Sequence, residues 1–305
     1  MAESNWKVSP DLLEGLDIPH RVDAPLGALT WYRTGGRAAV LASPRSAAEL
    51  SELVQRCKSR YVPIRILGAG ANLLVSDAGV DAVVVRLDDP SFKEIKIEGS
   101  TITAGAGVDL FKLVPASAKA GLDGLVHVAG IPATVGGAVR MNAGGAFGDI
   151  GESVKRVRVM SDAGEVYDRD RDDLEFGYRQ SNIRAPYILE AEFELDSNEP
   201  AELMKRYKEI YLFKKNSQPM GDKSAGCCFK NPPASAGATA GQLIDRAGLK
   251  GYRVGGATVS PVHANFVTAE PGKTTSADVI AVIEHIQEVV QQKFGVELQR
   301  ELVIW

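Results

Sequence analysis

Apolar residues along the chain follow two periods, and stretches of each kind alternate. Residues 63–67, 82–87 and 101–104 form short apolar runs rich in β-branched side chains, which is the pattern of strands. Residues 201–213 and 276–294 instead repeat apolar side chains every three or four positions, as one face of a helix requires. This alternation predicts a mixed α and β architecture.

A further helix is expected directly after Pro44. Ser46 and Glu49 have the spacing of a capping box, in which each side chain bonds the other's backbone N–H. The face that this helix would bury consists of Leu50, Leu53, Val54 and Cys57. We therefore expect Cys57 to be a core thiol.

The last helix of the chain is marked at both ends. Thr275 or Ser276 is available as its N-terminal cap, and Gly295 is suited to terminate it. The preceding Gly-Lys-Thr at 272–274 resembles the end of a phosphate-binding loop, but Val267 stands where that loop needs a glycine. We interpret the segment as a helix start.

These elements predict three units, covering residues 1–110, 111–198 and 199–305. In the first unit, a polar segment that ends in the turn at 98–100 is expected to separate the strands at 82–87 and 101–104, with no strand between them. Residues 196–200 are interpreted as a linker between the second and third units.

The second unit should contain a β-hairpin. Residues 156–160 and 165–168 are joined through Asp-Ala-Gly at 162–164, which is a turn signal. A strand is expected to follow at 187–195.

Composition excludes several classes of protein. A chain of 305 residues with 45% hydrophobic and 24% charged content is typical of globular proteins. A net charge of −4 and a pI near 5.7 argue against a nucleic-acid partner. Residues 1–10 lack the apolar core of a signal peptide, and no apolar run approaches the ~20 residues that span a bilayer. Only three cysteines occur, two of them adjacent, which disfavours a disulfide scaffold. We expect a cytoplasmic protein with no membrane partner.

Two glycine-rich segments suggest a bound cofactor. Gly-Ala-Gly-Ala-Asn at 68–72 follows an apolar strand, where glycines let backbone amides approach an anion. It is not a dinucleotide fingerprint, because Leu73 occupies the third glycine position, and taken alone it is more simply a tight turn. The second segment, 130–138, continues through 141–145 with too little side chain for a core and too much apolar character for a linker. A long cofactor explains both segments.

Five motifs in order resemble the flavin-dependent UDP-N-acetylenolpyruvoylglucosamine reductase family of bacterial peptidoglycan synthesis, from about residue 20 to the C-terminus. They lie at 67–74, 130–138, 177–181, 225–231 and 301–305. The resemblance implies an α+β fold: a two-part FAD-binding domain of the vanillyl-alcohol-oxidase type, and a C-terminal α+β substrate-binding domain whose final strand returns to the active site.

The resemblance also implies an activity. Members of the family use NADPH and bound FAD to reduce UDP-N-acetylglucosamine enolpyruvate to UDP-N-acetylmuramate, which serves cell wall biogenesis, cell shape and cell division. The 48 positions from Arg179 to Cys227 suggest the shorter subclass, which lacks an additional loop over the substrate.

In the family, the glycine-rich segments clamp the FAD pyrophosphate and flank the isoalloxazine. The residues that the resemblance assigns to FAD are Arg33, Gly35, Gly36, Gly68, Ala69, Gly70, Ala71, Asn72, Leu73, Gly130, Ile131, Pro132, Thr134, Gly136, Gly137, Ala138, Asn142 and Gly144. Bulky side chains at Gly70 or Gly137 are expected to block the cofactor. Two departures occur, because Ala71 stands where the family more often has Ser, and Phe147 lies one place beyond its usual aromatic residue.

Three residues match the catalytic positions of the family. Addition of hydride to an enolpyruvyl double bond places negative charge on the adjacent carboxylate, and Arg179 is a permanent planar cation suited to stabilise it. From local sequence alone, Arg179 is more simply interpreted as a surface residue, and the resemblance reverses this interpretation. Glu301 would help to hold the carboxylate or relay a proton, and the sequence leaves both roles open.

Cys227 stands at the proton-donor position, where the family usually has Ser. A thiol with a pKa of ~8.5 is mostly protonated near neutrality and gives up its proton more readily than an alcohol. If residues 226–231 are extended, Cys227 and Cys228 point to opposite faces, so Cys228 is expected to pack in the core. The alternative is that Cys227 is an inert buried thiol.

The expected substrate contacts are Tyr178, Ser181, Lys214, Lys215, Lys230, Asn231, His263 and Asn265. The lysines suit a diphosphate, although lysines at a helix end are often only solvated, and a histidine among apolar residues is often a core residue. No metal-ligand spacing occurs among the histidines and cysteines. The sequence is compatible with a monomer but does not fix the oligomeric state.

Two other functions remain open at this stage. One is an oxidase or dehydrogenase of the same flavin fold that acts on a different small molecule. The other is a non-catalytic module that binds a sugar nucleotide or a flavin. The catalytic set of Arg179, Cys227 and Glu301 disfavours the first, and the second stays open.

Overall fold

The structure is a computed structural model that describes residues 6–9 and 11–305. The expected absence of a signal peptide falls partly on residues 1–5 and 10, which lie outside the described residues. The chain forms two compact units. Unit 1 consists of Met1–Ala24, Ala38–Ala69 and Asp81–Phe213, and unit 2 consists of Pro25–Arg37, Gly70–Val80 and Lys214–Trp305. The boundaries expected after residues 110 and 198 stay a prediction.

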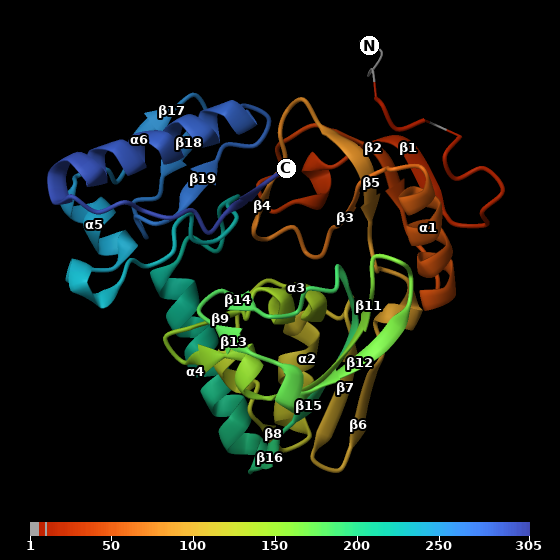
Figure 1. Ribbon diagram of the computed structural model, residues 1–305. Helices are drawn as coiled ribbons and strands as arrows, with labels where there is room; N and C mark the ends of the chain where they lie inside the picture. Colours follow the sequence, from red (N-terminus) through yellow and green to blue (C-terminus); the bar gives the residue numbers. More distant parts are fainter. Residues whose placement is uncertain (1–5, 10) are drawn as a thin grey trace. The chain divides into compact units, whose positions relative to one another are not determined.

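Unit 1 is built around two sheets (Figure 1). The smaller sheet has the order β1-β2-β5-β3, with the bounds His20–Pro25, Arg37–Ala42, Val80–Val85 and Ile64–Ile66. The larger has the order β12-β11-β15-β7-β6, with the bounds Val166–Asp170, Val154–Met160, Tyr187–Glu194, Thr101–Gly105 and Ile95–Glu98. Helices α1 (Ala47–Ser59), α2 (Leu110–Lys119) and α3 (Val135–Arg140) also belong to unit 1.

Short two-stranded pairs complete the connections of unit 1. They are β8 (Leu122–Asp123) with β16 (Asp196–Ser197), β9 (Gly144–Gly145) with β10 (Gly148–Asp149), and β13 (Phe176–Gly177) with β14 (Gln180–Ser181). Single 3₁₀ turns of unit 1 lie at Pro90–Phe92, Val126–Val128, Ile150–Glu152 and Arg171–Asp173. Those of unit 2 lie at Gly27–Leu29 and Ala234–Ala236.

The hairpin expected in the second part of the chain is confirmed. Strands β11 and β12 pair antiparallel, and the register ends with Met160 opposite Val166. Gly164 in the connecting turn has a φ of 84°, a left-handed conformation that glycine adopts without the cost of a Cβ clash.

Two expectations about irregular segments were wrong. The polar segment before residue 98 is strand β6, which pairs with β7 at the edge of the large sheet. An edge strand with one solvated face needs only alternate apolar residues, here Ile95 and Ile97, so it lacks the continuous apolar run of an inner strand. The supposed linker at 196–200 contains β16, and Pro200 already begins α4 (Pro200–Ser217).

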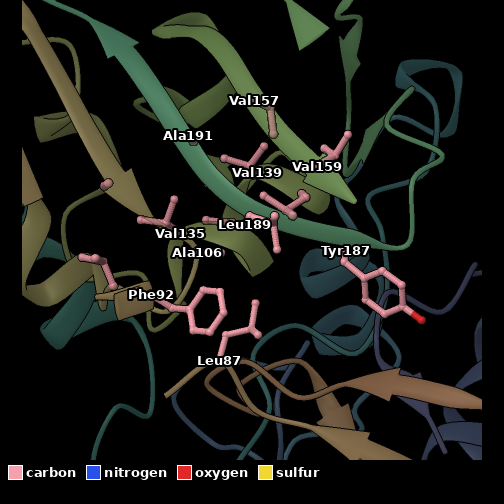
Figure 2. Packing of buried hydrophobic residues seen from close by; sticks show 14 of the residues in the cluster. Leu87, Phe92, Ala106, Val135, Val139, Val157, Val159, Tyr187, Leu189 and Ala191 are labelled. Atoms are coloured by element: carbon pink, nitrogen blue, oxygen red, sulfur yellow. The ribbon is translucent and has the colours of Figure 1, made fainter. Parts of the chain in front are cut away.

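Helix α3 packs on the large sheet, as Figure 2 shows. Val135 and Val139 of α3 are fully buried, and α3 contacts strands β15 and β7. The sheet side of this cluster includes Val157, Val159, Leu189 and Ala191, with Leu87 and Phe92 also in the cluster. Burial of this kind is the main stabilising contribution to the fold, at about 25 cal/mol per Å² of apolar surface.

Helix α1 confirms the predicted core face. Leu50, Leu53, Val54 and Cys57 are all buried, and burial raises the pKa of the Cys57 thiol to about 12. The capping box is only half formed. The Ser46 hydroxyl accepts from the Glu49 N–H at 3.1 Å, but the Glu49 carboxylate accepts from the backbone N–H of Arg45, not from that of Ser46.

Unit 2 contains the sheet β17-β18-β19 with helix α6 packed against it. Its elements are β17 (Arg253–Val254), β18 (Ala257–Val259), β19 (Val267–Ala269), α5 (Ala240–Arg246), α6 (Ser276–Phe294), and the parallel pair β4 (Leu73–Leu74) and β20 (Val303–Ile304). Thr275 caps α6 in a capping box with Asp278, and Gly295 ends it with a φ of 67°, as predicted. No helix within residues 6–9 and 11–305 is long and apolar enough to cross a membrane.

Candidate functional site

A cavity of about 570 Å³ opens in unit 1 and is lined by residues of both sheets and of α3. Its volume falls within the roughly 300–1,000 Å³ typical of small-molecule sites. Five of the residues assigned to FAD from the sequence line it: Gly68, Ala69, Thr134, Gly136 and Gly137. The end of strand β3 and the start of helix α3 are therefore brought together at one wall.

Glycines form this wall because side chains would not fit there. A Cβ on Gly68 would lie 2.7 Å from Thr134 Oγ1, and one on Gly136 would lie 3.0 Å from Ala106 Cβ. Gly137 differs, since a Cβ there would meet only Thr134 Oγ1, at 3.4 Å, and the residue is exposed. A side chain on Gly137 would therefore occupy the cavity without a clash in the protein. A backbone wall of this kind fits a cofactor that approaches the chain closely.

The cavity also carries charged residues that the sequence analysis missed. Arg86, Lys93, Lys112 and Arg140 line it together with Asp88 and Asp109. The Arg140 guanidinium donates to the backbone carbonyls of Ala185 at 2.5 Å and Pro186 at 3.1 Å, which fixes it beside strand β15. The excess of cations suits a ligand that carries phosphate groups. Arg86 directly follows the buried strand β5, and Arg140 is the last residue of α3, so each lies where a buried element ends.

Some glycines assigned to FAD lie outside this cavity, and there the packing of the chain itself requires a glycine. In unit 2, a Cβ on Gly35 would lie 2.5 Å from the carbonyl oxygen of Val75, and one on Gly70 would lie 2.6 Å from that of Leu29. Gly70 also has a φ of 65°. A bulky residue at Gly70 would therefore disturb the fold itself, and its expected effect on the cofactor stays a prediction.

The remaining residues assigned to FAD are divided between the units. Those in unit 2 are Arg33, Gly36, Ala71, Asn72 and Leu73. Those in unit 1 that do not line the cavity are Gly130, Ile131, Pro132, Ala138, Asn142 and Gly144. Ala138 is fully buried in the core. Asn142 is a structural brace, because its side chain accepts from the Gly151 N–H at 2.9 Å and donates to the Gly177 carbonyl at 3.0 Å.

Arg179 lies in the tight turn between β13 and β14. Its φ of 56° is left-handed, a conformation that costs a non-glycine residue on the order of 1 kcal/mol. Its Nη2 donates to the Gly144 carbonyl at 2.9 Å, and its Nη1 lies 3.5 Å from Asp149 Oδ1. Backbone strain at a well-anchored arginine is a feature of functional sites.

In unit 2, the segment that carries Cys227 pairs with the segment that carries Glu301. Phe229 and Arg300 form an antiparallel bridge, and the Glu301 N–H donates to the Cys228 carbonyl at 2.8 Å. The Asn72 side chain donates to the Glu301 carbonyl at 3.2 Å. Residues far apart in the sequence are thus joined at one backbone ladder, with Cys227 half-buried at its end.

Cys228 packs in the core, as predicted. It is 1% exposed and lies beside the fully buried Tyr32. Burial, with a smaller contribution from the Glu301 charge, raises the pKa of the Cys228 thiol to about 11. This thiol is therefore protonated and shielded at neutral pH.

Three of the residues expected to contact substrate already make hydrogen bonds within the protein. Asn265 is buried, and its side chain bonds both the N–H and the carbonyl of Phe229, at 3.0 Å and 2.8 Å. Asn231 Oδ1 accepts from the N–H of Ala240 at the start of α5, at 3.1 Å. The Ser181 hydroxyl donates to the Arg140 carbonyl at 3.0 Å. These three side chains therefore order the backbone of their own units.

The other residues expected to contact substrate differ in how far they are exposed to solvent. Tyr178 is 46% exposed, and the Arg179 guanidinium lies 5.0 Å from its ring centre. Lys214 is buried, Lys215 is exposed and Lys230 is half-buried. Burial lowers the pKa of His263, so that its imidazole is neutral at pH 7.

Comparison with known proteins shows what these features belong to. Residues 38–169 match the FAD binding domain, and residues 218–305 match the C-terminal domain of UDP-N-acetylenolpyruvoylglucosamine reductase. A protein of that name from Moorella thermoacetica is 39% identical to the chain, over 97% of this chain and 96% of its own length. The chain belongs to the UDP-N-acetylenolpyruvoylglucosamine reductase family. A second reductase of this name, from Enterococcus faecalis, is 38% identical over 96% of the chain and 97% of its own length.

A solved structure agrees with the family assignment. The crystal structure of UDP-N-acetylenolpyruvylglucosamine reductase from Thermus caldophilus is similar to the chain with a TM-score of 0.79 and 36% identity, covering 94% of this chain and 98% of its own. The expected α+β fold, an FAD-binding domain plus the C-terminal domain of this reductase family, is confirmed. The family assignment and the FAD cofactor, which the sequence motifs indicated, are confirmed as well.

Proposed function

We propose that the chain catalyses the NADPH-dependent reduction of UDP-N-acetylglucosamine enolpyruvate to UDP-N-acetylmuramate, in the cytoplasm, during peptidoglycan precursor synthesis. The observation that carries the proposal is the match to reductases of this name over nearly the whole length of both chains. Cell shape and cell division depend on this precursor in the same proposal.

The cavity of unit 1 is the proposed site of FAD. The backbone at Gly68, Gly136 and Gly137 would hold it, and Lys112 and Arg140 would balance its phosphate charge. When bound, FAD supplies the hydride chemistry that no side chain can perform.

Three side chains carry the rest of the proposed reaction. Arg179 binds the enolpyruvyl carboxylate and stabilises the charge that develops on it. Glu301 holds the same carboxylate or relays a proton. Cys227 donates the proton to the carbon next to the carboxylate, and its half-buried position at the end of the backbone ladder leaves the thiol within reach of a ligand. The substrate contacts named from the sequence remain part of the proposal.

The activity is tested with the purified holoenzyme in the absence of oxygen. NADPH should bleach the flavin absorbance, and adding the enolpyruvyl sugar nucleotide should restore it with formation of UDP-N-acetylmuramate. NADH serves as the comparison for the cofactor preference. Bleaching that the enolpyruvyl substrate cannot reverse would contradict the proposal and favour a different flavin enzyme.

Gly137→Val should prevent FAD from binding while the chain stays folded. Valine places a branched side chain at the cavity wall, where its Cβ would meet only Thr134 Oγ1, at 3.4 Å. We expect purified Gly137→Val protein to carry less than about a tenth of the wild-type FAD, with thermal unfolding of the apoproteins within a few degrees. Gly221→Val is the matched control, since a Cβ there meets no atom within 4 Å and the residue does not line this cavity. Stoichiometric FAD in Gly137→Val would place the cofactor elsewhere.

A further inference from the structure

The guanidinium of Arg179 is held from both strands of the β9–β10 hairpin. Gly144 on β9 accepts a hydrogen bond from Nη2 at 2.9 Å, and the Asp149 carboxylate on β10 lies 3.5 Å from Nη1. The Arg179 side chain is only 16% exposed, and that of Asp149 is 33% exposed. The ion pair is therefore partly shielded from water, unlike the exposed surface pairs of this chain.

Asp149 is itself fixed by its surroundings. Its backbone N–H donates to Glu152 Oε1 at 3.0 Å, and His127 Nε2 lies 3.1 Å from its carbonyl oxygen. Burial lowers the pKa of His127, which keeps its imidazole neutral at pH 7. His127 therefore does not compete with the Arg179 guanidinium for the negative charge of Asp149.

The glycine at position 144 makes this arrangement possible. A Cβ on Gly144 would lie 1.8 Å from Asp149 Oδ1, so any other residue would displace the carboxylate. The two contacts of Arg179 thus depend on one another, because the residue that offers the carbonyl also leaves room for the carboxylate.

We propose that Asp149 is a positioning residue for Arg179. Together with the Gly144 carbonyl it selects one orientation of a long side chain, so that the guanidinium is already in place when negative charge develops on the substrate carboxylate. The left-handed backbone at Arg179 brings the side chain to this hairpin, and the opposite charge of the Asp149 carboxylate attracts the guanidinium where water only partly screens the pair. This inference rests on the proposed role of Arg179 in the reduction.

Asp149→Ala should slow reoxidation of the reduced flavin by the enolpyruvyl substrate about tenfold or more, and leave flavin reduction by NADPH unchanged. Calorimetric binding of the substrate to the oxidised enzyme should change less than about threefold, because orientation is lost and not the cation. Asp149→Asn should recover part of the rate, since its amide oxygen can lie in the same place beside Nη1 without the full charge. FAD content and the unfolding temperature are measured to verify the fold.

Asp168→Ala is the matched control. Asp168 lies on β12 in the same unit and accepts from Arg158 Nε at 2.8 Å, a closer pair that does not involve Arg179. We expect both half-reactions of this variant to be unchanged.

A double-mutant cycle separates positioning from a general structural role. If Asp149 acts through Arg179, then Asp149→Ala should cost less than about threefold when Arg179 is already Lys. Equal costs in both backgrounds, or wild-type reoxidation in Asp149→Ala, would overturn the inference alone. Normal reoxidation in Arg179→Lys would instead remove Arg179 from the mechanism, and wild-type enzyme that the substrate cannot reoxidise would overturn the proposed function.

Discussion

Cys227→Ala is expected to slow the reoxidation of reduced flavin by the enolpyruvyl substrate at least ~100-fold, because it removes the proposed proton donor. Cys227→Ser should stay active, since a hydroxyl can donate the same proton. Reduction of the flavin by NADPH should be normal in both variants. Stopped-flow absorbance of each half-reaction measures the effect directly.

The other two thiols make the experiment specific. Cys57 and Cys228 are 0% and 1% exposed, and burial raises the pKa of these thiols to about 12 and about 11. A thiol reagent at neutral pH should therefore inactivate the wild type through Cys227 and spare Cys227→Ser.

Cys228→Ala is the control for the choice of thiol. It removes one buried sulfur next to Tyr32, so it should lose some stability and keep its activity. Rapid reoxidation in Cys227→Ala would end the assignment, and an inactive but folded Cys228→Ala beside an active Cys227→Ala would transfer the role to Cys228.

Arg179→Lys is expected to reduce the rate of the same half-reaction about 100-fold or more. Lysine keeps the positive charge but loses the planar fork, and it cannot reach Gly144 and Asp149 together from the turn. Flavin reduction by NADPH should change little, which distinguishes a defect in substrate chemistry from a loss of cofactor. Glu301→Gln should show the same division between the half-reactions.

The controls for these variants are their FAD content and unfolding temperature. Glu301 contributes its backbone N–H to the Cys228 carbonyl, and Glu301→Gln leaves that bond in place. Near-normal reoxidation in both Arg179→Lys and Glu301→Gln would exclude the two residues from the mechanism.

Elements with local signals could be predicted from the amino-acid sequence. The cap and end of α6 at Thr275 and Gly295 and the turn at Gly164 follow from short-range geometry, and each was predicted correctly. The core position of Cys57 follows from helical periodicity in the same way. The family and the FAD cofactor were also identified from motifs, because close backbone contact with a ligand requires glycine at fixed spacings.

Which glycines face a cavity, and which make room for other parts of the chain, depends on how distant segments pack together. Gly137 and Gly70 each lie in a glycine-rich motif. A Cβ on Gly137 would meet only Thr134 Oγ1, whereas a Cβ on Gly70 would clash with the Leu29 carbonyl oxygen. Likewise, no local pattern pairs Asp149 with Arg179 or joins Glu301 to Cys228, since the partners lie 30 and 73 positions apart. Local propensities act over a few residues, whereas such contacts arise when the packing of sheets and hairpins brings distant backbone segments together.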